Sequence, residues 1–250
     1  DDPDWEYKYQ NRIGKPFGSY GSVQPFGLKA LGLFASQEEI DNSPKQTYGE
    51  YRVGDIRYQD INGDGVIDSQ DEVALGYTNM PEIVYGFGAT AQWKNWDFNV
   101  FFQGVAHTSF FLAGASLRSP FSSGSMERSA VNEDIYGNVW MSTNTPEQND
   151  RAIYPRLSLS NQAGSSNNNQ TSDWWLRDGS FLRLKNFEIG YTLPKKLLGK
   201  NFIRSLRFYV AANNLLTFCN FKLWDPEKGS SDGSGYPLNR VVTLGFNINL

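Results

Sequence analysis

The feature that most constrains the fold of this chain is an alternation of apolar and polar residues that continues across a two-residue connection. Within residues 84–93 every second side chain is a ring or a small apolar group, and the same period resumes over residues 96–103. Only Lys94 and Asn95 separate the two runs. A period of two indicates an extended strand, and two such strands joined by two residues indicate a β-hairpin.

Three further segments repeat this alternation, over residues 187–193, 206–212 and 242–250. Their opposite faces carry polar side chains, among them Glu188 and Arg207. Polar groups that point inward are costly in a dry core but suit a wide lumen filled with water. The pattern alone equally fits half-buried strands of a soluble sheet, so composition has to separate these two interpretations.

Composition favours strands that contact a membrane. Aromatic residues make up 15% of the chain while its mean hydropathy is −0.51, which suits strands with rings toward lipid and polar groups toward water. No run approaches the ~18 consecutive apolar residues of a transmembrane helix, which excludes a helical membrane protein. The residues predicted to face lipid are Tyr85, Phe87, Trp93, Trp96, Phe98, Val100, Phe102, Leu244, Phe246 and Ile248.

The connections between these strands differ sharply in length. The turn at Lys94 and Asn95 is tight, whereas residues 106–171 and 220–238 form long stretches rich in Ser, Asn, Gly and Asp. Short turns on one side and long loops on the other are typical of outer-membrane barrels. Residues 161–171 are of low complexity and are expected to be mobile.

Two charges conflict with the strand pattern. In a regular strand Arg183 and Lys185 would point to the same face as the apolar Phe187 and Ile189, because every second residue shares a face. A charge on the lipid face at mid-membrane costs about 2–4 kcal/mol. We therefore expect this part of the strand to lie above the hydrocarbon.

Residues 60–71 have the spacing of a calcium-binding loop. Gly65 permits the sharp turn and Ile67 anchors the loop, and calcium takes six to eight oxygen ligands from such a loop. The alternative is a loop without metal, held by hydrogen bonds from Asp and Asn side chains to the backbone. The predicted ligands of a structural calcium ion are Asp60, Asn62, Asp64, the carbonyl of Val66, Asp68 and Asp71.

Other chemistry is poorly supported. The single Cys219 and single His107 leave too few groups for a catalytic dyad or a His-based zinc site. Carboxylate pairs such as Glu38-Glu39 and Glu133-Asp134 lie in polar stretches, and a net charge of −4 with a pI near 5.1 argues against a nucleic-acid partner. The chain is therefore not expected to be an enzyme. The aromatic residues of the long loops are candidates for stacking on sugars: Trp140, Trp174, Trp175 and Trp224.

Two other functions share some of these features. A secreted calcium-bearing β-sandwich that binds glycans would have the same alternating strands and the same loop, but its apolar faces would pair with each other. A glycan-cleaving enzyme would need two carboxylates facing one cleft. No such pair can be nominated from the sequence.

A series of short motifs, in order along the chain, resembles the SusC/RagA family of TonB-linked outer-membrane transporters. Each motif is weak alone, but together they cover nearly the whole length. They are Gly54-Asp55-Ile56-Arg57-Tyr58, Tyr85-Gly86-Phe87, Phe101-Phe102-Gln103-Gly104, Trp140 through Pro146, Tyr154-Pro155-Arg156-Leu157, Trp175 through Asn186, Gly190 through Pro194, Asn214 through Phe218, Asp225-Pro226-Glu227 and Tyr236-Pro237.

The resemblance implies an all-β fold, with residues 1–250 forming the C-terminal strands of a large antiparallel transmembrane β-barrel with long extracellular loops. The plug domain and the earlier strands are expected to lie outside this chain. The implied location is the outer membrane of a Gram-negative bacterium, in contact with lipid. The implied partners are a SusD-like surface lipoprotein, the TonB complex acting through the missing N-terminal part, and an imported oligosaccharide or peptide.

Overall fold

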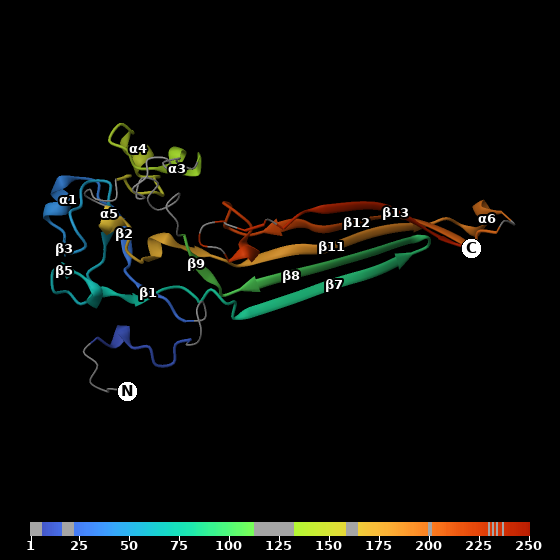
Figure 1. The fold of residues 1–250 in the computed structure, drawn as a ribbon, viewed down its shortest axis with the longest axis horizontal. Helices are drawn as coiled ribbons and strands as arrows, with labels where there is room; N and C mark the ends of the chain where they lie inside the picture. Colours follow the sequence, from blue (N-terminus) through green and yellow to red (C-terminus); the bar gives the residue numbers. More distant parts are fainter. Residues whose placement is uncertain are drawn as a thin grey trace. The chain divides into compact units, whose positions relative to one another are not determined.

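The computed structural model describes residues 7–16, 23–112, 133–158, 165–199, 202–229, 231, 233, 235–236 and 238–250. Parts of both predicted long loops, and Pro237 of the Tyr236-Pro237 motif, lie outside these residues. The chain divides into two compact units (Figure 1). The loop unit comprises Asp1–Met80, Ser109–Arg177 and Ser230–Ser234. The sheet unit comprises Pro81–Thr108, Asp178–Gly229 and Gly235–Leu250.

The sheet unit is built on five long antiparallel strands that lie side by side in Figure 1 in the order β13-β12-β11-β8-β7. This confirms the predicted hairpin; β8 begins at its predicted residue, and the other four strands begin before theirs. Two short helical segments, α6 (Lys195–Leu198) and η5 (Pro226–Lys228), lie in its connections. The five strands are β7 (Ile83–Trp93), β8 (Trp96–Ala106), β11 (Phe181–Thr192), β12 (Ser205–Phe218) and β13 (Val241–Asn249).

The register of these strands gathers the apolar side chains on one face. Phe87 lies opposite Phe102 with ring centroids 5.2 Å apart, and Trp93 lies opposite Trp96 at the turn, as predicted. Among the described residues no helix is long and apolar enough to cross a membrane. The face defined by this register, here called the apolar face, includes Tyr85, Phe87, Ala89, Ala91, Trp93, Trp96, Phe98, Val100, Phe102, Phe187, Ile189, Tyr191, Phe208, Val210, Leu244 and Phe246.

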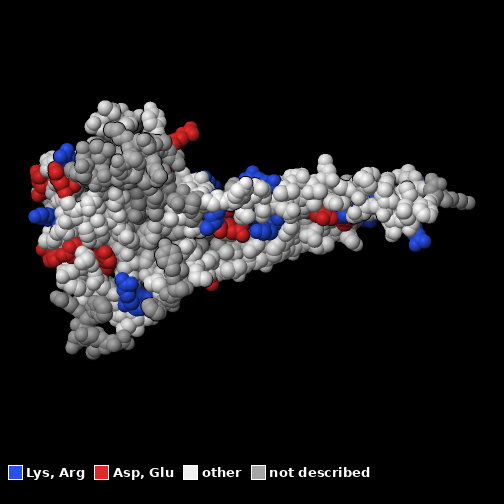
Figure 2. Space-filling view, viewed as in Figure 1, with Lys and Arg blue, Asp and Glu red and all other residues white. Residues whose placement is uncertain are grey.

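The opposite face of the sheet carries a cluster of charges. Arg207 Nε donates to Asp97 Oδ1 over 3.0 Å, and Arg207 Nη2 also donates to Glu188. A Cβ atom at Gly190 would collide with the Arg207 guanidinium group, so the glycine lets this side chain lie across the neighbouring strand. On the side shown in Figure 2 the sheet unit is mostly uncharged, and its charged atoms gather in a few patches.

A β-bulge in β11 corrects the expectation for Arg183 and Lys185. The pairing with β8 passes from Leu184 directly to Asn186, which leaves Lys185 without a partner residue in the ladder. One extra residue in a strand moves the side chains that follow it to the opposite face of the sheet. Arg183 therefore pairs with Gln103 on the polar face, whereas Phe187 pairs with Val100 on the apolar face.

The two cations at the bulge are paired with carboxylates of the η5 segment. Arg183 is only 1% exposed and lies 2.5 Å from Asp225 and 3.4 Å from Glu227, while Lys185 lies 3.4 Å from Glu227. The strand thus changes face within one residue, which removes the conflict with the alternating pattern at Arg183. The position of these charges above the hydrocarbon stays a prediction.

Within its described residues, the loop unit contains only short elements. Its helical segments are η1 (Lys8–Gln10), α1 (Gln37–Asp41), η2 (Ser69–Asp71), α3 (Glu133–Asn138), α4 (Pro146–Asn149), α5 (Ser165–Asn168) and η4 (Asp173–Trp175). Its strand pairs are β1 (Phe26–Gly27) with β6 (Val73–Ala74), β2 (Ala30–Leu33) with β4 (Ile56–Tyr58), β3 (Lys45–Gln46) with β5 (Val66–Ile67), and β9 (Ser109–Phe111) with β10 (Leu176–Asp178). Its buried apolar core includes Leu28, Phe34, Ile56, Tyr58, Ile67, Leu112, Ile135, Tyr154 and Trp175.

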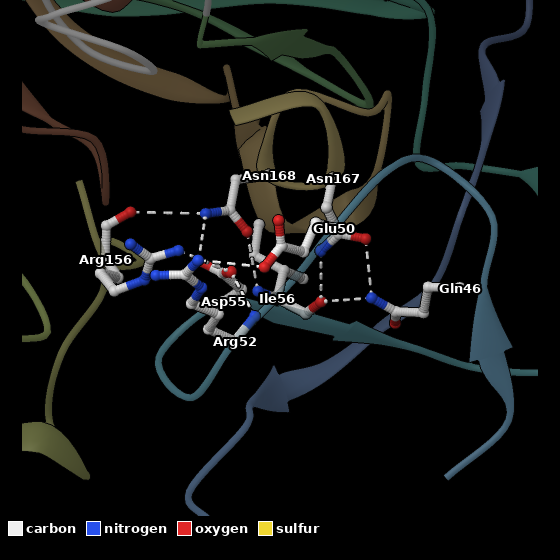
Figure 3. Close-up of polar contacts among 8 residues, drawn as sticks. All are labelled: Gln46, Glu50, Arg52, Asp55, Ile56, Arg156, Asn167 and Asn168. Atoms are coloured by element: carbon white, nitrogen blue, oxygen red, sulfur yellow. Dashed lines mark hydrogen bonds and ion pairs between the residues drawn. The ribbon is translucent and has the colours of Figure 1, made fainter. Parts of the chain in front are cut away.

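Buried amide side chains complete the hydrogen bonding of β4. Gln46 Nε2 and Asn167 Nδ2 both donate to the Ile56 carbonyl, over 3.0 and 2.9 Å, and the Ile56 N–H donates to Asn168 Oδ1 (Figure 3). Asn167 is 0% and Asn168 is 3% exposed. The expectation that residues 161–171 are mobile is thus wrong for these two asparagines, whereas residues 161–164 lie outside the described residues.

The carboxylate of Asp55 lies at the centre of this network. It is fully buried, accepts from the Arg52 N–H over 2.7 Å, and lies 3.0 Å from Arg156 Nη2 (Figure 3). Asn168 Nδ2 donates to its other oxygen over 2.9 Å. A buried charge needs such pairing because the protein interior solvates it poorly.

We predict that Asp55→Ala destabilises the loop unit by about 3–5 kcal/mol, since it leaves buried donors and the Arg156 charge without their acceptor. The matched control is Glu50→Ala, which removes a 3.0 Å pair with Arg52 whose two side chains are 68% and 62% exposed. That change should cost about 0–1 kcal/mol. Urea titration of the full-length protein with limited proteolysis measures both effects, and equal losses would contradict the assignment.

Candidate functional site

The predicted calcium loop folds as a turn closed by its own side chains. Asp60 accepts from the N–H groups of Gly63 and Gly65 over 2.6 and 2.8 Å, and Asp64 accepts from the Val66 N–H over 2.8 Å. The two glycines have φ values of 79° and 83°, a region that favours glycine. Ile67 is fully buried and anchors the loop.

Asp71, the last predicted ligand, closes the loop from inside the core. It is fully buried and accepts from the Ile61 N–H over 2.7 Å and from the Asp68 N–H over 2.9 Å. Asp68 in turn accepts from the Gln70 N–H, which completes a capping box around η2.

These hydrogen bonds leave open both alternatives that the sequence predicts, a calcium loop and a turn without metal. Within the described residues no group of three or more His, Cys, Asp and Glu side chains is arranged to hold a metal ion. The donor types are those of calcium, but in the structure the loop carboxylates accept hydrogen bonds from the loop backbone. Calcium at Asp60, Asn62, Asp64, Val66, Asp68 and Asp71 stays a prediction.

We predict that Asp71→Ala destabilises the loop by about 1–3 kcal/mol even in a calcium chelator, because two partly buried N–H groups lose their buried acceptor. Asp64→Ala is the control, since Asp64 is exposed and accepts within the loop only. Calorimetric calcium titration of the full-length protein is the second measurement. Binding heat that vanishes in Asp60→Ala and Asp64→Ala would place the ion here, and unchanged heat in both would place it elsewhere.

The four loop tryptophans lie in different surroundings. Trp175 is fully buried and donates from Nε1 to the Asn168 carbonyl over 2.7 Å, so the expectation that it is a sugar-stacking candidate is wrong. Trp224 is half-buried with its ring 4.8 Å from that of Phe221. Trp140 and Trp174 are also half-buried, and each lines a cavity of the loop unit.

The larger cavity has a volume of about 620 Å³ and is lined by Trp140 together with Arg52, Val53, Met141, Arg156 and Leu157, among others. The smaller one, about 470 Å³, is lined by Trp174 with Ala30, Ile153 and Arg177. Cavities of 300–1,000 Å³ are the size of small-molecule sites. Sequence reasoning missed both cavities, because their walls come from segments that are far apart in the chain.

The ten residues predicted to face lipid all lie on the apolar face. Leu244, Trp93 and Phe246 are 78%, 67% and 62% exposed, and Phe98 and Val100 are half-buried. Within the described residues no second layer therefore seals this face, which argues against a β-sandwich with paired apolar faces. Contact of these residues with lipid stays a prediction.

Among the described residues of the loop unit, Tyr48 and Tyr154 have a raised pKa. Burial raises the pKa of Tyr48 to about 12, and burial together with the hydrogen bond to Asp134 raises the pKa of Tyr154. Both phenols are therefore protonated near neutral pH and are poor general bases. Of the carboxylate pairs, Glu39 pairs with Arg57, and Asp134 accepts from the Tyr154 hydroxyl over 2.8 Å.

An antiparallel sheet with one exposed apolar face and one charged face is the arrangement expected for the wall of a membrane β-barrel. The sequence is similar to TonB-dependent receptors P26 (33% identity, 89% of the chain) and P3 (29%, 95%) of Formosa agariphila. It is 23% identical over 99% of its length to the TonB-dependent receptor SusC of Bacteroides thetaiotaomicron. The chain spans about 22% of each of these relatives. No protein-family model matches the sequence.

Solved structures of the RagAB peptide importer share the fold. The closed-closed state gives a TM-score of 0.60 over 90% of the chain at 23% identity, and the open-open state gives 0.61 over 94% at 21%. The chain covers 23% and 24% of those structures. Together, these sequence relatives and structures confirm the predicted resemblance to the SusC/RagA family of TonB-dependent transporters. The protein is located in the outer membrane of a Gram-negative bacterium. Its relatives are named as receptors and importers, not as enzymes.

Proposed function

We propose that this chain forms part of the barrel wall and the extracellular loops of an outer-membrane transporter that imports oligosaccharides or peptides. The observation that carries the proposal is the apolar face, which continues across five antiparallel strands and is exposed. In water such a face promotes association. In a bilayer its alternate residues contact hydrocarbon while their neighbours line a wet lumen.

The two edges of the sheet support a larger barrel. β7 and β13 each pair with one neighbour in the five-stranded sheet, so each has one edge of backbone N–H and C=O groups outside it. Within a membrane such edges have to be paired, which only a closed barrel achieves. In this proposal the remaining strands of the same protein pair with β7 and β13.

The proposed partners follow from the family. SusC and RagAB relatives support a SusD-like surface lipoprotein at the extracellular mouth and energy supplied by the TonB complex through a part of the protein outside this chain. RagAB is described as a peptide importer, so the proposed cargo includes peptides as well as oligosaccharides. Calcium bound at residues 60–71 would have a structural role and no part in transport.

We predict that Val100→Arg reduces assembly into the outer membrane, because a guanidinium group on the lipid face near the middle of a spanning strand costs about 2–4 kcal/mol. Asn99→Arg is the matched control, since it changes the adjacent residue of β8 on the polar face. The folded fraction of the full-length protein is measured by heat-modifiable migration in gels and by urea titration. Equal losses for the two variants would contradict the assignment of the faces.

The transport proposal itself is tested in the native host. Deleting the gene for the full-length protein should abolish uptake of one class of labelled oligosaccharide or peptide, and inactivating TonB should cause the same loss. Complementation with the wild-type gene is the control. Unchanged uptake of every labelled oligosaccharide and peptide in the deletion strain would refute the proposed function.

A further inference from the structure

Trp140 lines the larger cavity, and its indole ring, here called the floor of that cavity, rests on a glycine. A Cβ atom at residue 54 would lie 2.4 Å from Cδ2 and Cε3 of Trp140 and 2.9 Å from Cε2. These three atoms surround the fused bond of the indole, so the backbone of Gly54 lies under a face of the ring. Gly54 has a φ of 88°, which further restricts the position to glycine.

The ring is also fixed through its own backbone. The Trp140 N–H donates to the Tyr154 carbonyl over 3.0 Å, and the Arg156 N–H donates to the Gly54 carbonyl over 2.8 Å. The segments that carry the ring and its support are thus tied together. A flat aromatic surface held in this way is ordered before any ligand arrives, which reduces the entropy lost on binding.

The rim of the cavity is polar but not strongly charged. Arg156 is neutralised by the buried Asp55 and Arg52 by the exposed Glu50. Ser142 and Thr143 are exposed and add hydroxyl groups to the lining. Apart from the polar Gln37, the remaining walls are apolar, with Val53, Met141 and Leu157 among them.

We propose that this cavity is a binding subsite for a neutral sugar unit of an oligosaccharide. A pyranose ring has a face of C–H groups, which fits the indole and the aliphatic walls, and a rim of hydroxyl groups, which fits Arg52, Ser142 and Thr143. The proposal rests on the proposed import function and deepens it by naming the ligand class of one site.

The lining favours a sugar over an extended peptide. Peptides that bind in extended form usually add to the edge of a strand, where backbone groups satisfy their N–H and C=O groups. None of the described residues that line this cavity lies in a strand; Gln37 opens α1 and the others lie in connecting segments. Because both arginines are paired with carboxylates, the cavity also has no excess positive charge for an acidic ligand.

The test begins with the full-length protein in detergent on an array of neutral, sulfated and uronic-acid oligosaccharides. The neutral oligosaccharide that binds most strongly is then titrated by calorimetry. Trp140→Ala should weaken its binding at least about tenfold, the loss expected for a stacking contact with its buried area. The matched control is Tyr136→Ala, an exposed aromatic residue of α3 that lines neither cavity, which should leave the affinity within about twofold.

A second variant guards against simple misfolding of Trp140→Ala. Ser142→Trp places a large side chain at an exposed lining position without changing the contact between Trp140 and Gly54, and it should also weaken binding at least about tenfold. Trp140→Phe retains an aromatic floor and should keep binding but lose the sugar-induced change in tryptophan emission.

Three results would overturn the subsite. They are an array without any bound neutral oligosaccharide, affinity unchanged in both Trp140→Ala and Ser142→Trp, and Trp140-dependent binding of a tryptic casein digest without sugar binding. The third result leaves the import function standing, since peptides are within it. Trp140-dependent sugar binding together with unchanged uptake in the deletion strain would instead refute the import function and keep the subsite.

Discussion

The sheet unit depends on one constraint, which is that alternate side chains must keep their face through every cross-strand pairing. The pairing aligns Phe98 of β8 with Ile189 of β11, and Val210 of β12 with Leu244 of β13. A slip of one residue in any strand would carry its apolar set to the charged face. β11 satisfies the constraint because Lys185 forms a bulge and has no partner residue on β8. This one unpaired residue lets the strand present Arg183 to one face and Phe187 to the other.

The loop unit is stabilised in a different way. Its strands are two to four residues long, too short for ladders that satisfy many backbone groups, and buried N–H and C=O groups must still be paired. Gln46, Asn167 and Asn168 take that role, since their amides bond Ile56 and Tyr58 as the edge of another strand would. A buried polar network of this kind rigidifies a fold when every member is satisfied. The tightly held Asp55 is therefore as important here as the apolar contacts.

Much of the sheet unit was predictable from the sequence, because a period of two is a local signal. The hairpin around Lys94 and the apolar faces of β7, β8 and β13 agree with the structure. The bulge was not predicted, since lysine is no marker of a bulge. The one available signal was that Arg183 and Lys185 occupy alternate positions at which the pattern expects apolar residues. In the loop unit the sequence predicts a mobile asparagine-rich run, because composition does not reveal which amides meet a buried backbone. The burial of Trp175 and the positions of the two cavities were likewise not predictable, because they depend on contacts between segments far apart in the sequence.

The contact between Gly54 and Trp140 connects the stability of the loop unit with its proposed binding. The residue after Gly54 is the buried Asp55, whose partner Arg156 also lines the cavity and donates its backbone N–H to Gly54. The core network and the cavity floor are thus built from neighbouring residues of the same segments. A ligand that binds only the ordered cavity would stabilise this network by mass action. Conversely, loosening the network would lower affinity by reducing the fraction of molecules with an ordered floor.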